Sequence, residues 1–504
     1  MKHIYSLLSV LLLSCAILVY GQEPAMTIKT LAVSGTNFYF HLSSHTPDVK
    51  VTVDFGEGTT PKEFTLGNDT LTEIRGTTAA DQTIKVYGNA ESLLSLRCPD
   101  GYFITSIDVS KCTTMQAIHC DNNELREIDV TNIPSLIYLS LRASKLTAID
   151  VSKNPNLKYL YLSSGYTIES LDVSKNPELE LLNISDCRTI KSLDVSKNLK
   201  MISLSCDACP ITEIDVSNLT ELQSLVTSYT FIESLDVSKN TKLTSLYCSV
   251  SNRYDKYIRS LDITNLPDLE ILFCSGQKLT ELDLSKNTKL KSLFCSNCLL
   301  SSLDLSNCPE LLEISLFSNY FTFATLPVLD LGFYVYSPQK KISVPQNIKT
   351  GEEFDLSDQL LVDGNMTKYK WKTKAGKALQ QYTDYIVSEG KTTFLKTQSD
   401  SVFCEMENSF FPGLVISTTN VHVEQGSGID NASMSTTQVF AEDNTINISV
   451  VESCRAMVFD ISGKMISEKQ LQAGNNQIVI SQPGVYFVKI NNSRSTGTHK
   501  VLIK

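Results

Sequence analysis

Two Cys-x-x-Cys pairs are the residues in this sequence whose type and spacing first suggest chemistry. Cys206 and Cys209 form one pair, and Cys295 and Cys298 form the other. Such pairs occur in redox dithiols and as halves of zinc sites, because a thiolate is both a nucleophile and a metal ligand. Whether these thiols react depends on the elements that hold them, and an internal repeat identifies those elements.

The tripeptide Leu/Ile-Asp-Val/Leu/Ile recurs every 21 or 22 residues, with one interval of 26. Its aspartates are Asp108, Asp129, Asp150, Asp172, Asp194, Asp215, Asp236, Asp262, Asp283 and Asp304. Periods of 20–29 residues with a Leu-x-x-Leu-x-Leu core are typical of leucine-rich repeats, in which each repeat adds one strand to a parallel sheet on a concave face. We therefore predict a mainly β chain, with a leucine-rich-repeat solenoid over residues 91–323 and β-sandwich domains after it.

Both cysteine pairs fall on core positions of this repeat. Cys206 takes the place of the last core leucine, and Cys209 lies three residues later, where leucine-rich repeats place an inward Asn or Cys. A buried thiol has a raised pKa and reacts slowly, so we predict a structural role rather than a redox or zinc site. In-register neighbours about 4.8 Å apart point the same way and cannot readily reach disulfide geometry, which predicts a ladder of free thiols.

The recurring aspartates could hold calcium, because stacked carboxylates are suitable ligands for that ion. The alternative is that each carboxylate accepts backbone hydrogen bonds where the chain turns on the convex side. Lysine follows three residues later in many repeats, as in Lys153 after Asp150, and compensates the charge locally. We favour the turn and predict no metal and no cofactor.

The phrases LTELDLSKNTKLKSLFCSN and IESLDVSKNTKLTSLYCSV resemble the cysteine-ladder repeats of internalin J and of the internalin-like surface proteins of Bacteroidetes. The resemblance covers residues 93–319 and includes the period, the LDVSKN phrase and the cysteine column. It implies an adhesin.

The ends of the chain predict export. Residues 1–21 combine Lys2 and His3 with an apolar run and a small residue at Gly21, which indicates a secretory signal peptide; a lipoprotein acylated at Cys15 is the alternative. Residues 22–90 alternate apolar and polar positions and predict a β-rich cap on the solenoid. No later stretch reaches about 18 consecutive apolar residues, so we predict that the chain is not transmembrane.

Residues 340–425 read as short strands and resemble an immunoglobulin-like sandwich, with Trp371 in the strand C position and Cys404 in strand F. The partner cysteine of strand B and the corner tyrosine are missing from the pattern. Residues 426–436 form a small-polar linker.

Residues 437–504 contain VFDISGK, GVYFVKI and the ending KVLIK, and resemble the type A C-terminal sorting domain of the type IX secretion system. The common Pro-Asn-Pro opening is replaced by VFAEDNTINI. The resemblance implies the type IX machinery as a partner, export to the outer-membrane exterior, removal of this domain and, often, attachment to lipopolysaccharide.

Two broad classes of function are disfavoured by composition. The net charge of −11 and the absence of a basic run argue against nucleic-acid binding. The six histidines are scattered and stand beside no nucleophile motif or HExxH, so we predict no enzyme activity.

Aromatic side chains gather on the outward strand positions of the predicted concave sheet. They form two clusters with a serine-rich stretch between them, and the candidate ligand-binding residues are Tyr138, Tyr159 and Tyr161, then Tyr247, Ile271, Phe273, Phe294 and Phe317. Exposed aromatics are frequent hot spots of protein interfaces and also stack on sugars. The alternative for the second cluster is packing against the following domain.

The 26-residue interval contains an insertion within residues 251–257, and solenoid insertions often map to binding loops. Arg253, Tyr254 and Tyr257 are therefore secondary candidates, with a drifted loop as the alternative.

The sequence as a whole predicts a secreted, surface-displayed binding protein that acts as an adhesin for a protein or glycan of a host or neighbouring cell. The alternative function is a module that captures glycan or peptide for partner enzymes.

Overall fold

The structure is a computed structural model that describes residues 22–101, 103–251, 255–426, 438–442, 444–450, 452–491 and 496–503. The predicted signal peptide and nearly all of the predicted linker lie outside these ranges. The chain divides into two compact units. The first extends as far as Leu316 and includes Leu329–Val335, and the second consists of Phe317–Val328 and the chain from Tyr336 onward.

The N-terminal part of the first unit is a two-layered β cap. Its elements are β1 (Met26–Thr30), β2 (Asn37–Ser44), β3 (Val49–Asp54), β4 (Lys62–Leu66), β5 (Thr72–Thr77), β6 (Thr83–Tyr87), the 3₁₀ turn η1 (Ala90–Ser92), β8 (Ile104–Asp108) and β10 (Glu127–Ile128). One layer has the strand order β10-β8-β1-β6-β3-β4, whereas β2 and β5 extend the sheet of the repeats. Phe38, Phe40 and Leu42 alternate along β2 and are fully buried, so this strand seals the first rung of the solenoid core.

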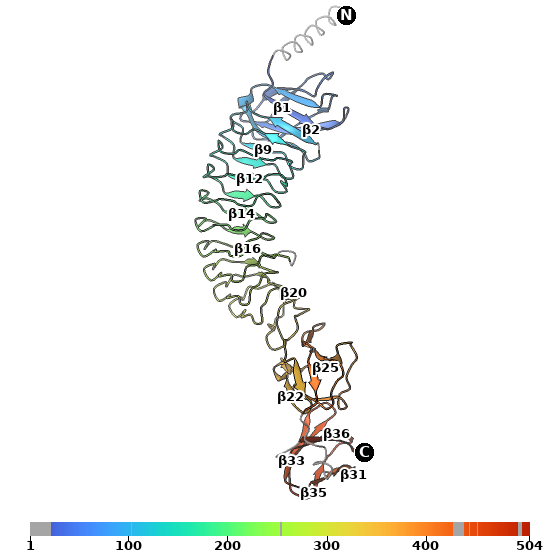
Figure 1. The fold of residues 1–504 in the computed structure, drawn as a ribbon. Coiled ribbons are helices and arrows are strands. Elements are labelled where there is room, and N and C mark those ends of the chain that lie inside the picture. Colours follow the sequence, from blue (N-terminus) through green and yellow to red (C-terminus); the bar gives the residue numbers. More distant parts are fainter. Residues whose placement is uncertain are drawn as a thin grey trace, which may run out of the picture. The chain divides into compact units, whose positions relative to one another are not determined.

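The repeats form one parallel sheet, with a single short strand from each rung of the solenoid (Figure 1). Its strands are β7 (Leu93–Arg97), β9 (Ala117–His119), β11 (Tyr138–Ser140), β12 (Tyr159–Tyr161), β13 (Leu181–Asn183), β14 (Ser203–Ser205), β15 (Ser224–Val226), β16 (Ser245–Tyr247), β17 (Ile271–Phe273), β18 (Ser292–Phe294), β19 (Glu313–Ser315) and β20 (Phe333–Val335). The leucine-rich-repeat solenoid is thus confirmed, and β20 adds a rung beyond the predicted limit at residue 323.

Buried columns inside the solenoid explain the cysteines. Every cysteine that the structure describes is free and buried. Cys206 and Cys209 are fully buried, and the Sγ of Cys209 donates to the Ile184 carbonyl of the previous rung at 3.0 Å. The thiols therefore fill core space and satisfy backbone acceptors.

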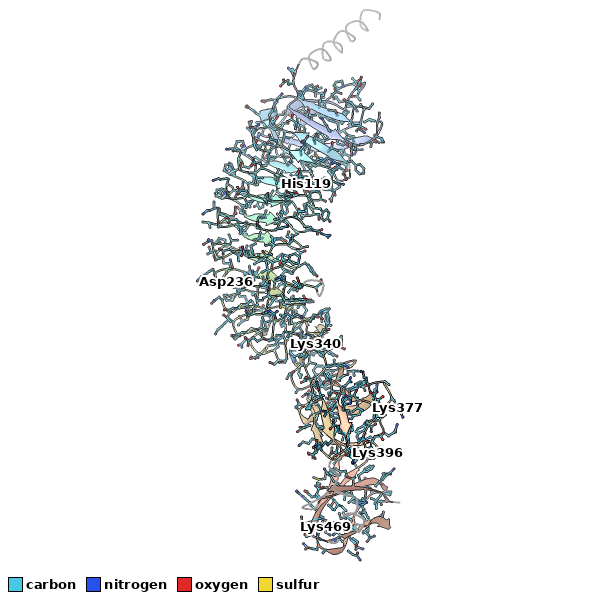
Figure 2. The ribbon with its side chains drawn as sticks, viewed as in Figure 1. His119, Asp236, Lys340, Lys377, Lys396 and Lys469 are labelled. Atoms are coloured by element: carbon cyan, nitrogen blue, oxygen red, sulfur yellow. The ribbon has the colours of Figure 1, made fainter. Side chains whose placement is uncertain are left out.

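The convex turns are held by the recurring aspartates. The Oδ1 of Asp236 accepts a hydrogen bond from the backbone N–H of Ser238 at 2.9 Å, and the aspartates of the other rungs do the same. These hydrogen bonds lower the pKa of Asp236. Figure 2 labels Asp236 on the outer edge of the curved solenoid, and the carboxylate has the turn-forming role that the sequence favoured over calcium.

A buried asparagine column lies beside these turns and was not anticipated. Its members are Asn154, Asn176, Asn198, Asn240 and Asn287, all fully buried. The side-chain amide of Asn198 donates to the carbonyls of Val173 at 3.0 Å and Asn176 at 2.9 Å. The column therefore ties the convex turn of each rung to the rung before it.

The second unit contains two groups of short strands. The first group comprises β21 (Asn347–Lys349), β22 (Glu353–Asp355), the 3₁₀ turn η2 (Ser357–Gln359), β23 (Leu361–Val362), β24 (Asn365–Met366), β25 (Lys368–Thr373), β26 (Tyr385–Ser388), β27 (Lys391–Phe394), β28 (Val402–Glu407), β29 (Val415–Ser417) and β30 (His422–Glu424). Trp371 on β25 pairs with Cys404 on β28, and its indole donates to the Thr392 hydroxyl at 3.0 Å. The adjacent pairing fits strands C and F, while the immunoglobulin-like assignment stays a prediction.

The second group follows the linker. Its strands are β31 (Gln438–Glu442), β32 (Thr445–Val450), β33 (Cys454–Asp460), β34 (Met465–Leu471), β35 (Gly474–Val479), β36 (Gly484–Asn491) and β37 (Thr496–Ile503). They form a three-stranded and a four-stranded antiparallel sheet. Alternate residues such as Ile446, Val458 and Val488 are buried in one common core, so this segment has a hydrophobic core of its own.

Candidate binding surface on the concave face

The candidate surface is the outward face of the parallel sheet, which is referred to below as the concave face. Each three-residue strand from β9 to β19 buries its central leucine or isoleucine and leaves its first and last side chains mostly half-buried, whereas β20 has the half-buried Tyr334 at its centre. Because the strands are in register, equivalent side chains from neighbouring rungs lie side by side. Ser140 and Ser315 are exceptions, because each is the last residue of its strand and is buried.

The N-terminal aromatic cluster consists of Tyr138, Tyr159 and Tyr161. The ring of Tyr138 lies 6.3 Å from that of Tyr159 and 5.6 Å from that of Tyr161, measured between centroids. The hydroxyl of Tyr159 donates to Glu180 at 2.9 Å, and this hydrogen bond raises the pKa of the phenol. The three predicted tyrosines are thus brought together, and a carboxylate from the next rung fixes one of them.

The C-terminal aromatic cluster consists of Tyr247, Ile271, Phe273, Phe294 and Phe333. Its ring centroids are 4.9 Å apart for Tyr247 and Phe273, 4.2 Å for Phe273 and Phe294, and 5.8 Å for Phe294 and Phe333. Ile271 is half-buried at the first position of β17, where it pairs with Ser245 of β16 and Ser292 of β18. Phe333 is 44% exposed and was missed, because the sequence pattern of β20 does not repeat the leucine core.

The remaining predicted site residues do not belong to either aromatic cluster as the structure describes it. Phe317 is half-buried, follows β19 and belongs to the second unit. Arg253 and Tyr254 lie outside the described residues. Tyr257 is half-buried, and the Lys278 ammonium lies 4.6 Å from the centroid of its ring.

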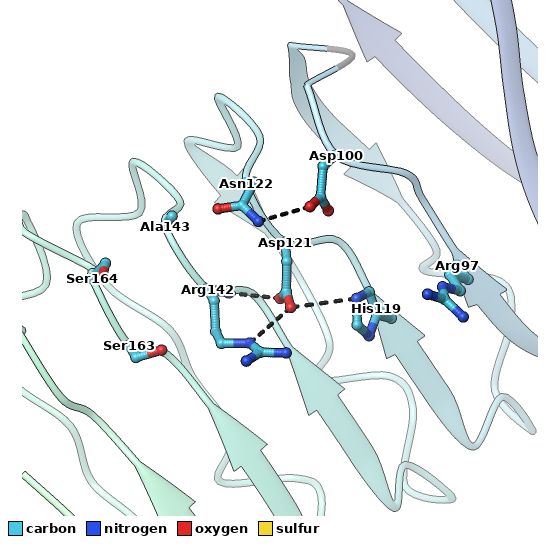
Figure 3. Close-up of a pocket in the computed structure, with 9 residues that line it drawn as sticks. All are labelled: Arg97, Asp100, His119, Asp121, Asn122, Arg142, Ala143, Ser163 and Ser164. Atoms are coloured by element: carbon cyan, nitrogen blue, oxygen red, sulfur yellow. Dashed lines mark hydrogen bonds and ion pairs between the residues drawn. The ribbon is translucent and has the colours of Figure 1, made fainter.

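A polar pocket borders the N-terminal cluster, and sequence reasoning missed it (Figure 3). It has a volume of about 390 Å³ and is lined by Arg97, Asp100, His119, Asp121, Asn122, Arg142, Ala143, Ser163 and Ser164. Arg97 and His119 end neighbouring strands and lie in register. The rings of Tyr138 and His119 are nearly parallel, with their centroids 6.3 Å apart, and Cζ of Arg142 lies 5.4 Å from the ring centroid of Tyr161. The pocket and the N-terminal aromatic cluster are therefore continuous.

Asp121 organises the pocket from beneath. The residue is only 3% exposed, and its carboxylate accepts hydrogen bonds from the Ser140 hydroxyl at 2.7 Å and from the backbone N–H and Nε of Arg142 at 2.9 and 2.8 Å. Nε2 of His119 lies 3.3 Å from the same carboxylate. Burial lowers the pKa of His119 more than Asp121 raises it, so the imidazole is neutral at pH 7. A signal was available: Asp121 and Arg142 carry opposite charges in one column of adjacent rungs.

The cysteine pairs lack the features of a reactive site. Burial raises the pKa of Cys209 to about 12 and that of Cys206 still further, which leaves almost no thiolate at pH 7. In the described ranges, no group of three or more His, Cys, Asp or Glu side chains is arranged to hold a metal ion.

Comparison with known proteins identifies the C-terminal segment. Residues 442–504 match the family described as secretion system C-terminal sorting domain, which confirms the type IX sorting domain within the predicted 437–504. A comparison with curated proteins gives no significant match. Among the described residues, no helix has the length and apolar character needed to cross a membrane.

Solved structures similar to this chain include two from Listeria monocytogenes. The functional domain of InlJ, which includes a cysteine ladder, is 22% identical, with 69% of this chain and 94% of that chain covered and a TM-score of 0.41. The internalin inlF is 22% identical, with 47% and 77% covered and a TM-score of 0.37. The ectodomain of the Arabidopsis thaliana receptor kinase GASSHO1/SCHENGEN3, solved in complex with CASPARIAN STRIP INTEGRITY FACTOR 2, is 15% identical, with 50% and 42% covered and a TM-score of 0.36.

Proposed function

We propose that this protein is an exported adhesin that binds a protein or glycan of a host or neighbouring cell through the concave face of its solenoid. The observation that carries the proposal is the pair of half-buried aromatic clusters on consecutive rungs. Tyr247, Phe273 and Phe294 are each half-buried, and each has a neighbouring ring within 4.9 Å between centroids. Such preassembled aromatic surface loses little conformational entropy on binding, which is why aromatics dominate interface hot spots.

The sorting domain supports the location that this function needs. A type IX sorting domain directs export, so the proposal places the solenoid on the outer-membrane exterior after removal of residues 437–504. Attachment to lipopolysaccharide is part of the same proposal. The proposal assigns no catalysis to the chain.

The test is binding of the purified full chain to intact host or neighbouring cells. Phe273→Ala removes the central ring of the C-terminal cluster, which contacts rings on both sides. We expect at least a tenfold loss of affinity, as for an interface hot spot. The matched control is Tyr166→Ala, because Tyr166 is 51% exposed but lies outside the sheet. Unchanged binding by Phe273→Ala would count against the concave face.

Location is tested separately by fractionation and intact-mass analysis of cells that produce the protein. A surface-exposed form that lacks residues 437–504 is expected. Retention inside the cell of a form that still ends at Lys504 would contradict export through the sorting domain. The alternative function is capture of glycan or peptide for partner enzymes. It replaces adhesion if the bound cell component is a substrate of those enzymes and leaves the protein only after they have acted on it.

A further inference from the structure

We propose that the polar pocket between Arg97 and Arg142 is a binding site for a carboxylated saccharide. In this arrangement a carboxylate of the saccharide meets an arginine guanidinium group of the pocket, and the sugar ring lies against the N-terminal aromatic cluster. The inference rests on the proposed function only in that both use the concave face, because the C-terminal aromatic cluster takes no part in it.

The two arginines offer free donors to a ligand. Arg142 uses its backbone N–H and Nε on Asp121, and no hydrogen bond to its terminal nitrogens is found within the described part of the chain. Arg97 is exposed, and its guanidinium likewise has no hydrogen-bond or ion-pair partner among the described residues. Guanidinium groups match the planar geometry of a carboxylate, and charge-assisted hydrogen bonds of this kind are stronger than neutral ones.

Asp121 makes the site preorganised rather than merely basic. Its buried carboxylate fixes Arg142 by two hydrogen bonds and lies against His119, so these groups do not have to be ordered when a ligand arrives. The Asp121 oxygens are occupied by partners, and the carboxylate is almost fully buried. Its charge therefore holds the arginine in place without presenting an anion at the surface.

The other lining groups favour a saccharide over an acidic peptide. Asp100 is exposed and is held by the Asn122 amide at 3.0 Å, which provides acceptors for hydroxyl groups but repels a run of carboxylates. Ser163 and Ser164 add further hydroxyls to the lining. Tyr138 and Tyr161 contact pocket residues directly, and an aromatic face suits the C–H face of a sugar ring. A volume of about 390 Å³ is within the range of small-ligand pockets.

The test uses the full chain and two matched probes in calorimetric titrations. One probe is a tetrasaccharide with alternating glucuronate residues, and the other is the same tetrasaccharide with its carboxylates reduced to primary alcohols. We expect the acidic probe to bind at least tenfold more tightly than the reduced probe. Equal binding of the two, or no binding of either, would overturn the proposal.

Variants locate the binding to the pocket. Arg97→Gln is expected to weaken binding of the acidic probe at least tenfold. It should not disturb Asp121, because Arg97 does not contact that residue. Tyr138→Ala is expected to weaken the binding of both probes. Arg259→Gln, an exposed arginine outside the pocket, is the control and should leave binding unchanged. Insensitivity to Arg97→Gln would refute the site, and tighter binding of a Glu-rich peptide than of the tetrasaccharide would refute the ligand class.

These results are separable from those for the proposed function. If Phe273→Ala abolishes cell binding while neither saccharide binds, the concave-face adhesin survives and the pocket proposal fails. If the saccharide binds but cell binding is unchanged by Phe273→Ala, the pocket proposal survives and the assignment of cell binding to the C-terminal aromatic cluster fails.

Discussion

Replacement of Asn198 tests how the convex side of the solenoid is held together. Asn198 is fully buried, and its amide nitrogen donates to two carbonyls of the previous rung, those of Val173 and Asn176. Both carbonyls also accept a backbone N–H within their own turn, from Asn176 and Leu179. The side chain therefore contributes a second hydrogen bond to each, and its loss leaves neither carbonyl without a partner.

The expected cost follows from three contributions. Asn198→Ala loses two hydrogen bonds worth about 1 kcal/mol each and leaves a small cavity. It also removes Oδ1 of Asn198, a buried oxygen with no hydrogen-bond partner in the described ranges, which offsets part of the loss. We expect the free energy of unfolding to fall by about 2 kcal/mol.

Two further variants separate hydrogen bonding from packing. The next rung carries Leu219 in the same column, fully buried, so Asn198→Leu places a side chain that this position already accepts. It should lie within about 1 kcal/mol of wild type, because apolar burial replaces the lost hydrogen bonds. Asn198→Asp keeps the shape but removes the donors and buries a charge, which should cost at least about 3 kcal/mol.

The assay is urea unfolding of the full chain followed by two probes. Far-UV circular dichroism follows the unfolding of both units, whereas fluorescence of the only tryptophan, Trp371, follows the second unit alone and is the internal control. A change below about 0.5 kcal/mol in Asn198→Ala would refute the hydrogen-bond argument. So would an Asn198→Asp variant no less stable than Asn198→Ala.

Three other outcomes are expected. Burial raises the pKa of Cys248 and Cys404 to about 12, so the folded chain keeps protons that the unfolded chain releases above about pH 8.5. The free energy of unfolding should therefore fall by about 1.4 kcal/mol per pH unit for each such thiol between pH 9 and 11. In a series of urea titrations at different pH values, Cys248→Ala should reduce that slope. Iodoacetamide labelling followed by mass spectrometry should modify Cys206 and Cys209 only after denaturation, and rapid labelling of the native chain would restore the redox hypothesis. Lys242→Ala breaks an exposed ion pair with Glu221 and should change the free energy of unfolding by less than about 0.5 kcal/mol. A loss above about 1 kcal/mol would contradict the view that an exposed ion pair contributes little to stability.

The period of the sequence was enough to predict the solenoid because leucine or isoleucine recurs at the central position of the repeat strands. Leu160, Leu246 and Leu293 occupy the same fully buried place in their rungs, and Cys248 and Cys295 stand two residues later, in the column of the last core leucine. The aromatic clusters followed from the same register, since the side chains next to each central leucine point outward. The last strand of the sheet could not be predicted from the repeat, because β20 has Tyr334 at the central position where the pattern requires leucine.

The asparagine column shows why polar core residues are harder to assign. Asn recurs in the phrase SKN, which reads as a polar turn, and the apolar Ile133, Leu219 and Leu266 at the equivalent positions of other rungs are the signal in the sequence that this column is buried. Only the structure shows that the amide reaches the carbonyls of the rung before it, as in Asn240 to Val216 and Leu219. A column that tolerates either Leu or Asn is one in which hydrogen bonds and apolar burial are of similar worth.

The polar pocket depends on side-chain direction, which the period does not specify. Column neighbours can be listed from the repeat, and Asp121 and Arg142 stand one rung apart in such a list. The list does not reveal that Arg142 turns back to Asp121, that Asp121 is buried, or that His119 lies against the same carboxylate. A buried carboxylate requires partners, and those of Asp121 come from its own rung, as His119, and from the next rung, as Ser140 and Arg142. The ligand-facing groups of the pocket are therefore positioned by a residue that no ligand needs to touch, and variants of Asp121 should impair binding through the orientation of Arg142 rather than through a lost contact.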